Sequence, residues 1–125
     1  MDSLPLISVV DNDDSVRESL HGLIRSVGFA VQVFASAEEF LRSDHLHQTH
    51  CLILDVRMPG MNGFELQREL IATHSEIPVI FITAHGNETA RMQALKNGAV
   101  DYLCKPFSEE ALLNAIRSTL SLGVM

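Results

Sequence analysis

Five short apolar runs, each followed by a longer segment with helical spacing, constrain the fold of this chain more than any other feature. The runs cover residues 6–10, 30–34, 51–54, 78–82 and 102–104. Several of them are continuously apolar rather than alternating, which is typical of strands covered on both faces. Such strands belong to parallel sheets with helices packed on each side.

The segments between the runs carry helix signals. Gly28 follows the first amphipathic segment, as a helix-ending glycine does. Ser36-Ala37-Glu38-Glu39 predicts a capping box at the start of the second helix. Ser108 predicts the cap of the fifth helix, with Glu109 and Glu110 near its positive end. The positions expected to face the core are Val16, Leu20, Leu23, Ile24 and Val27, then Phe40 and Leu41, then Leu66, Leu70 and Ile71, then Met92 and Leu95, and finally Leu112, Leu113, Ile116 and Leu120.

This order predicts an α/β fold with a single doubly wound, five-stranded parallel sheet and five helices on both faces. Right-handed crossovers limit how the chain winds, and the flavodoxin-like strand order 2-1-3-4-5 is one solution. A chain of 125 residues suffices for one domain with a proper core. We therefore expect residues 1–125 to form one domain.

Composition excludes several functions. The net charge of −7 argues against direct nucleic-acid binding, which requires clustered Lys and Arg. No apolar stretch approaches the ~20 residues of a membrane helix, and the N-terminus lacks the features of a signal peptide. Cys51 and Cys104 lie in apolar runs, so we expect both to be buried, reduced thiols in a cytoplasmic protein.

Polar residues follow four of the apolar runs. Asp11-Asn12-Asp13 follows the first run, Asp55 the third, Thr83 the fourth and Lys105 the fifth. The carboxyl ends of parallel strands share one edge of a sheet, where open α/β sheets bind ligands. Carboxylates crowded there repel each other unless a cation joins them, and oxygen ligands suit Mg²⁺ or Mn²⁺. The sequence therefore predicts an oxygen-lined metal site.

This set of residues suits phosphoryl transfer. The loop after the first run has no glycine, so it cannot wrap a phosphate as glycine-rich loops do. With a cation bound, the Asp55 carboxylate can act as a nucleophile and form an acyl phosphate. Lys105 would neutralise a phosphoryl oxygen and Thr83 would donate its hydroxyl to another.

Four motifs carry a family resemblance: VVDND (9–13), LILDVRMPGMNG (52–63), FITAHG (81–86) and YLCKPF (102–107). Together they resemble the CheY-like receiver domain of bacterial two-component response regulators, and most of all FixJ-type receivers. The resemblance covers about residues 6–120. Such receivers usually precede a helix-turn-helix DNA-binding domain, and no output domain is expected in this chain.

The resemblance implies a phosphoacceptor that catalyses its own phosphorylation and dephosphorylation in the cytoplasm, with a sensor histidine kinase as partner and phosphoryl source. The implied roles are Asp55 as phosphoacceptor, Asp11, Asn12, Asp55 and the backbone carbonyl of Arg57 as metal ligands, Thr83 and Lys105 as phosphoryl contacts, Tyr102 as the switch aromatic, and Pro106 as a cis-proline.

Position 12 departs from the family pattern. The resemblance implies an acidic pair, but Asn12 brings an oxygen without a charge. Asp13 next to it is a candidate to compensate. We expect weaker Mg²⁺ binding than in a receiver with two carboxylates at positions 11 and 12. Arg57 and His85 lie two residues past Asp55 and Thr83, where they are candidate modulators of the phosphoryl group, although a plain loop role explains His85 equally well.

The resemblance also implies a switch. We expect Thr83 to move toward the phosphoryl group and Tyr102 to swing inward, which changes the face formed by the fourth helix, fifth strand and fifth helix. That face is expected to form a homodimer on phosphorylation.

Two other functions stay open. Asp11-x-Asp13 followed by Ser15-Val16 resembles the nucleophile motif of haloacid-dehalogenase-type phosphohydrolases, which would use Asp11 and leave Asp55 without a role. A pseudo-receiver would only bind partners. For single residues, simpler interpretations exist as well: residues 11–14 as a helix cap, and Lys105 as a surface lysine.

Overall fold

A computed structural model of the chain describes residues 4–122. It contains one sheet of five parallel strands in the order β2-β1-β3-β4-β5, which confirms the predicted order. The strands are β1 (Leu6–Val10), β2 (Ala30–Phe34), β3 (Cys51–Asp55), β4 (Val79–Thr83) and β5 (Asp101–Cys104). The helices are α1 (Asp14–Ser26), α2 (Ala37–Arg42), α3 (Gly63–Ala72), α4 (Glu88–Lys96) and α5 (Glu109–Leu122), with a short 3₁₀ helix η1 (Leu46–Gln48) before β3.

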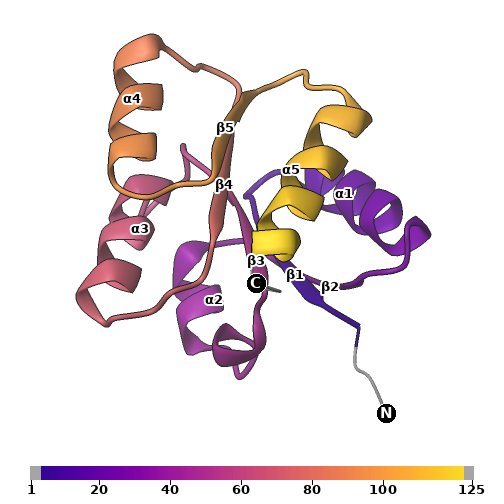
Figure 1. The fold of residues 1–125 in the computed structure, drawn as a ribbon. Coiled ribbons are helices and arrows are strands. Elements are labelled where there is room, and N and C mark those ends of the chain that lie inside the picture. The colour runs from indigo at the N-terminus through magenta and orange to yellow at the C-terminus, as the bar shows by residue number, and fades with distance from the viewer. Residues whose placement is uncertain (1–3, 123–125) are drawn as a thin grey trace.

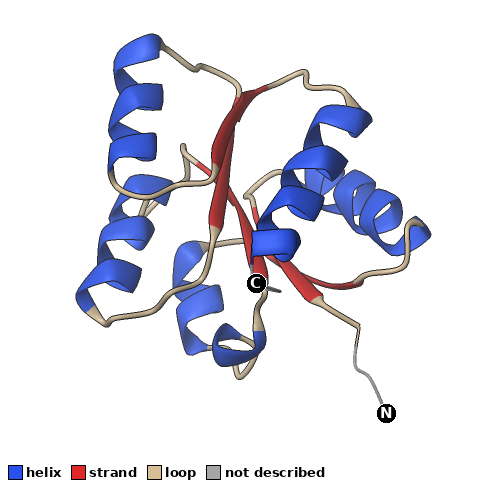
Figure 2. Cartoon of the chain, in the orientation of Figure 1, coloured by secondary structure: helices blue, strands red, loops and turns tan. Residues whose placement is uncertain are grey.

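Helices cover both faces of the sheet, which is seen edge-on in Figures 1 and 2. Helices α2, α3 and α4 lie on one side, and α1 and α5 lie on the other. Each side has its own buried cluster: Phe40 and Phe81 belong to the first, and Ile24 and Ile116 to the second. Burying one such side chain contributes about 1.5–3 kcal/mol. Two-sided burial explains why the strand sequences are continuously apolar.

Helix caps differ partly from the prediction. Ser36 does cap α2, because its hydroxyl accepts a hydrogen bond from the Glu39 N–H. Among the described residues, the Glu39 side chain makes no return bond to the Ser36 N–H, so the capping box is incomplete. The neighbouring Glu38 side chain contacts a different loop instead. The complete capping box lies instead at the start of α3, between Asn62 and Glu65.

Three expected core positions are exposed. Met92 of α4 is 61% exposed, Ile71 of α3 is 50% exposed, and Val27, just past the end of α1, is 37% exposed. In α4 only Ala94 is buried. Helical spacing identified an apolar stripe, and the expected Leu95 does pack against the core, partly buried, but Met92 lies on the exposed side of α4 and remains in solvent.

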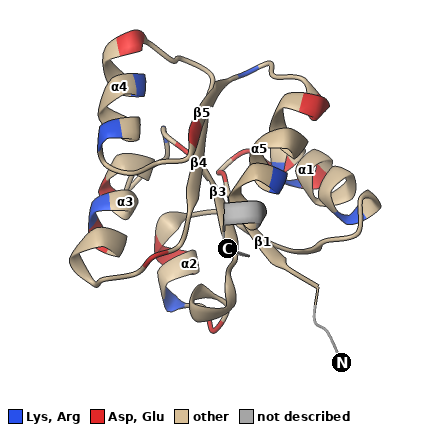
Figure 3. Ribbon diagram, viewed as in Figure 1, with Lys and Arg blue, Asp and Glu red and all other residues tan. Residues whose placement is uncertain are grey.

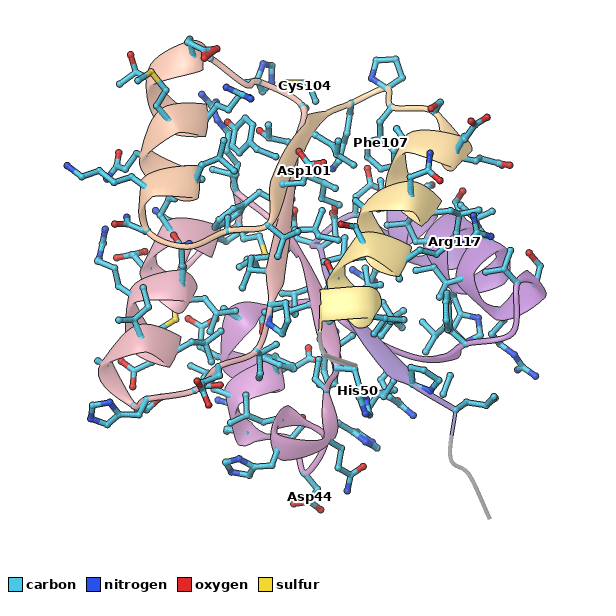
Figure 4. All side chains as sticks on the ribbon, in the orientation of Figure 1. Asp44, His50, Asp101, Cys104, Phe107 and Arg117 are labelled. Carbon is cyan, nitrogen blue, oxygen red and sulfur yellow. The ribbon has the colours of Figure 1, made fainter. Side chains whose placement is uncertain are left out.

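The prediction of two buried thiols is correct for Cys51 and wrong for Cys104. Cys51 is buried in the central strand β3, and burial raises the pKa of its thiol to about 12. Cys104 is exposed, because it is the last residue of the edge strand β5 (Figure 4). Among residues 4–122, no helix has the length and apolar character needed to cross a membrane.

Candidate functional site

Three charged side chains from separate strands meet at the carboxyl end of the sheet. Asp11 follows β1 directly, Asp55 ends the neighbouring strand β3, and Lys105 follows β5. The Lys105 Nζ lies 2.9 Å from Asp11 Oδ2 and 3.9 Å from Asp55 Oδ1. Figure 3 shows acidic segments in red among the loops at this end of the sheet, and a basic segment in blue on the loop after β5. The convergence expected from the sequence is therefore present.

The Asp11 side chain is fully buried and both of its oxygens are engaged. Oδ1 accepts a hydrogen bond from the Asp13 N–H at 2.9 Å, and Oδ2 accepts one from Lys105. The Arg17 guanidinium, which also pairs with Asp14, donates to the Asp11 backbone carbonyl at 2.7 Å. Asp11 is thus held in one position, which suits a ligand better than a nucleophile.

Asp55 has a strongly perturbed carboxyl group. The side chain is almost fully buried, and this burial is the main reason why its pKa rises from 3.8 to about 6. The nearby negative charge of Asp11 raises the pKa further, while the Lys105 ammonium and a hydrogen bond from the Arg57 backbone lower it. Two buried carboxylates with a single ammonium between them leave an excess of negative charge that a cation would neutralise.

Thr83 ends β4 beside this pair and is 1% exposed. Its Oγ1 accepts a hydrogen bond from the His85 N–H at 3.2 Å, so the hydroxyl proton remains available to donate to another group. The backbone carbonyl of Thr83 accepts the Lys105 N–H at 2.7 Å, which ties Lys105 to the end of β4. The Lys105–Pro106 peptide bond is cis, as the family resemblance implies.

Tyr102 is already turned inward. It is 6% exposed, and its ring centroid lies 6.3 Å from that of Phe81. Burial is the main reason why the pKa of its phenol is raised above the usual value. The inward arrangement that we expected only after phosphorylation is therefore the one that this structure contains.

The residues fit a hard cation that keeps part of its water shell. Mg²⁺ typically takes one or two carboxylates, other oxygens and several waters. Asp11, Asp55 and the Arg57 carbonyl are the candidate oxygens for such a cation, and the crowded negative charge of Asp11 and Asp55 would favour it there. Within residues 4–122 no cluster of three or more His, Cys, Asp or Glu side chains could hold a metal, so a cage made of side chains alone is absent.

The remaining predicted residues lie at the margin of this site. Asn12, Arg57 and His85 are exposed. Asp13 uses its Oδ1 to cap α1 by accepting from the N–H groups of Ser15 and Val16. The simpler interpretation of Asp13 as a helix cap therefore describes this residue in the structure.

One contact near the site was not expected from the sequence. The Glu38 carboxylate on α2 accepts a hydrogen bond from the Met61 N–H, in the loop that follows Asp55. The two residues lie 23 positions apart. In the sequence, Glu38 belongs to the predicted helix cap, and nothing there indicates this long-range contact.

Comparison with known proteins identifies relatives over nearly the whole chain. The family model "Response regulator receiver domain" matches residues 7–117. The response regulator protein TodT of Pseudomonas putida is 46% identical over 122 residues, which cover 98% of this chain and 54% of TodT. The transcriptional regulatory protein FixJ of Azorhizobium caulinodans is 44% identical over 119 residues, or 95% of this chain and 56% of FixJ. The chain thus spans about half the length of these curated relatives.

Solved structures show the same fold. The response regulator StyR has a TM-score of 0.88 at 50% identity, with 96% of this chain and 61% of that chain covered. The structure of FixJ-N has a TM-score of 0.82 at 37% identity, with 95% of this chain and 94% of that chain covered. Both proteins share the arrangement of strands and helices described above.

Proposed function

Because this chain belongs to the response regulator receiver domain family of two-component systems, whose relatives include transcriptional regulators, we propose that Asp55 accepts a phosphoryl group from a sensor histidine kinase. The observation that carries this proposal is the unequal state of the two buried carboxylates. Asp11 has both oxygens engaged, whereas Lys105 lies 3.9 Å from Asp55 and 2.9 Å from Asp11. Asp55 is the less restrained nucleophile.

In the transfer, an Asp55 oxygen attacks the phosphorus atom of a phosphohistidine. The phosphorus–nitrogen bond breaks, an acyl phosphate forms, and the leaving imidazole takes up a proton. A bound Mg²⁺ or Mn²⁺ would supply positive charge to the carboxylates and phosphoryl oxygens. Lys105 would leave Asp11 to contact one phosphoryl oxygen, and the free Thr83 hydroxyl proton would bind another. Attack of water on the acyl phosphate would regenerate the carboxylate.

A groove beside the crevice supports a protein donor. Its volume is about 410 Å³, and it lies between α1 and the start of α5, lined by apolar residues that include Leu20 and Phe107, together with Lys105. A partner that packs into this groove is placed next to the Lys105 ammonium and so near Asp55. A kinase that uses ATP supplies the phosphoryl group in the cytoplasm, and we place this domain there.

We further propose that the phosphoryl group acts on Thr83 and Tyr102. Attraction between the Thr83 hydroxyl and the phosphoryl oxygens would shift the equilibrium toward the inward Tyr102. The size of this shift is limited by how much more strongly the phosphoryl group interacts with that state than with the other. The face formed by α4, β5 and α5 would then form a homodimer. Residues 1–125 would act as the phosphoacceptor unit, and a DNA-binding domain outside this chain would regulate transcription.

Acetyl phosphate provides a direct test. With Mg²⁺ present, mass spectrometry should locate one phosphoryl group on Asp55 in wild type and in Glu39→Ala, and none in Asp55→Asn. Modification of Asp11 instead would support the phosphohydrolase alternative. A wild-type chain that neither binds Mg²⁺ nor takes up phosphoryl groups would be a pseudo-receiver, contrary to our proposal.

A further inference from the structure

The loop between β3 and α3 carries Arg57, whose carbonyl is a candidate metal ligand. The two ends of the loop are held by its own residues: the Gly63 N–H donates to the Val56 carbonyl at 2.9 Å, and Asn62 caps α3. Within the loop Met58 is buried, whereas Arg57 and Pro59 are exposed and Gly60 has no side chain to pack. Met61 packs partly against the core, and the turn before it, at Pro59 and Gly60, depends on a contact from elsewhere.

Glu38 of α2 supplies that contact. Its Oε2 accepts a hydrogen bond from the Met61 N–H at 3.0 Å. Gly60, just before Met61, has a φ of +74°, and a Cβ added there would lie 2.8 Å from the same Oε2. The carboxylate thus lies in space that only a glycine leaves open, directly over the turn of the loop. The hydrogen bond to Met61 and the close approach to Gly60 both place the Glu38 carboxylate against this turn.

Helix α2 is a firm support for this contact. Ala37 and Phe40, on either side of Glu38 and Glu39, are both fully buried in the cluster shared with α3 and α4. The pKa of Glu38 is lowered, chiefly by the Met61 hydrogen bond and to a smaller degree by Arg42. The carboxylate is therefore charged at neutral pH, and hydrogen bonds to charged acceptors are stronger than neutral ones.

We propose that Glu38 is a positioning residue for the phosphorylation site, because it fixes the loop that carries the Arg57 carbonyl next to Asp55. This inference rests on the proposed function. Groups that orient metal ligands without touching the metal commonly change metal affinity by 10-fold or more when they are removed. Glu38 acts through the backbone, and we expect an effect at the low end of that range.

The test compares Glu38→Ala with Glu38→Gln, and uses Glu39→Ala as a control. Glu39 neighbours Glu38 on α2 and is exposed, so its removal changes the net charge equally without touching the loop. The first readout is the amide proton of Met61 in ¹H–¹⁵N NMR spectra, without metal. It should move upfield in Glu38→Ala, move less in Glu38→Gln, whose amide oxygen can still accept, and stay unchanged in Glu39→Ala.

The second readout is Mg²⁺ affinity, measured by titration. Glu38→Ala should bind Mg²⁺ about 10-fold more weakly than wild type, with partial recovery in Glu38→Gln and no change in Glu39→Ala. An unmoved Met61 signal in Glu38→Ala, or an affinity no lower than that of Glu39→Ala, would overturn the inference while wild-type Mg²⁺ binding and phosphorylation stand. A wild-type chain without either activity would overturn the proposed function instead. Glu38→Gln keeps the test decisive if Glu38→Ala folds poorly.

Discussion

Replacing Asp55 with Asn should stabilise the metal-free protein at neutral pH. The folded state raises the Asp55 pKa from 3.8 to about 6, so it disfavours the charged carboxylate relative to the unfolded chain. Each pKa unit corresponds to about 1.4 kcal/mol. The full shift would amount to about 3 kcal/mol, and we expect a gain of about 1–3 kcal/mol because the site opens toward water through the partly exposed Lys105.

The sign of the pH dependence follows from the raised pKa. Between about pH 4 and pH 6 the folded state binds more protons at Asp55 than the unfolded state does, so wild-type stability falls as pH rises through this window. Asn resembles the protonated carboxyl group and has no such dependence. The advantage of Asp55→Asn should therefore be largest above about pH 6.5 and should vanish below about pH 4.

Urea unfolding followed by circular dichroism, with a chelator present, measures this difference at each pH. Asp44→Asn is the charge-matched control, because Asp44 is exposed in the segment before η1. Adding Mg²⁺ should stabilise wild type selectively, since a ligand that binds only the folded state adds to its stability. If Asp55→Asn were less stable than wild type at neutral pH without metal, or if the gap persisted in acid, the account of an Asp55 charge disfavoured by burial and by Asp11 would be wrong.

Three further changes test other parts of the molecule. Asn12→Asp should bind Mg²⁺ about 5-fold or more tightly in a titration, since a full charge about 4 Å from a cation is worth about 1 kcal/mol even in water; equal or weaker binding would contradict the expectation for position 12. Gly63→Ala should lower the free energy of unfolding in urea by about 1–3 kcal/mol, because its Cβ would lie 2.4 Å from the Asp55 backbone carbonyl; Gly22→Ala, with open space around it, should not be destabilising. Thr83→Ala should still take up a phosphoryl group on Asp55 but should no longer dimerise in response, which analytical ultracentrifugation with beryllofluoride would show; dimerisation equal to wild type would refute the proposed coupling.

Strand positions could be predicted because burial on both faces leaves a direct trace in the sequence. The first two strands have the predicted bounds, β3 extends one residue further, to Asp55, β4 begins and ends one residue later than predicted, at Val79 and Thr83, and β5 begins one residue earlier, at Asp101. Asp55 and Thr83 are polar, so an apolar pattern stops before them. Backbone pairing with the neighbouring strand continues, since it does not depend on the side chain.

Exposure and long-range contacts were harder to predict. Cys104 and Met92 have apolar character, but exposure depends on where the edge of the sheet lies and on how closely a helix approaches it. Glu38 has the same residue type as its neighbour Glu39, and only the fold brings it to Met61. Lys105 and Asp11 are 94 residues apart, and only their convergence was expected, because parallel strands end at one edge; their direct contact was not.

The division of the core by the sheet has a consequence for signalling. Tyr102 and Phe81 belong to the cluster beneath α2, α3 and α4, whereas α1 and α5 pack on a separate cluster that includes neither ring. A displacement of Tyr102 would disturb the packing under α4, where Ala94 is the single buried residue of the helix, and leave the packing of α1 unaltered. Phosphorylation would then change the packing on one side of the sheet, whereas the Asp11 loop and α1 on the other side would keep their structure and could bind the next phosphoryl donor.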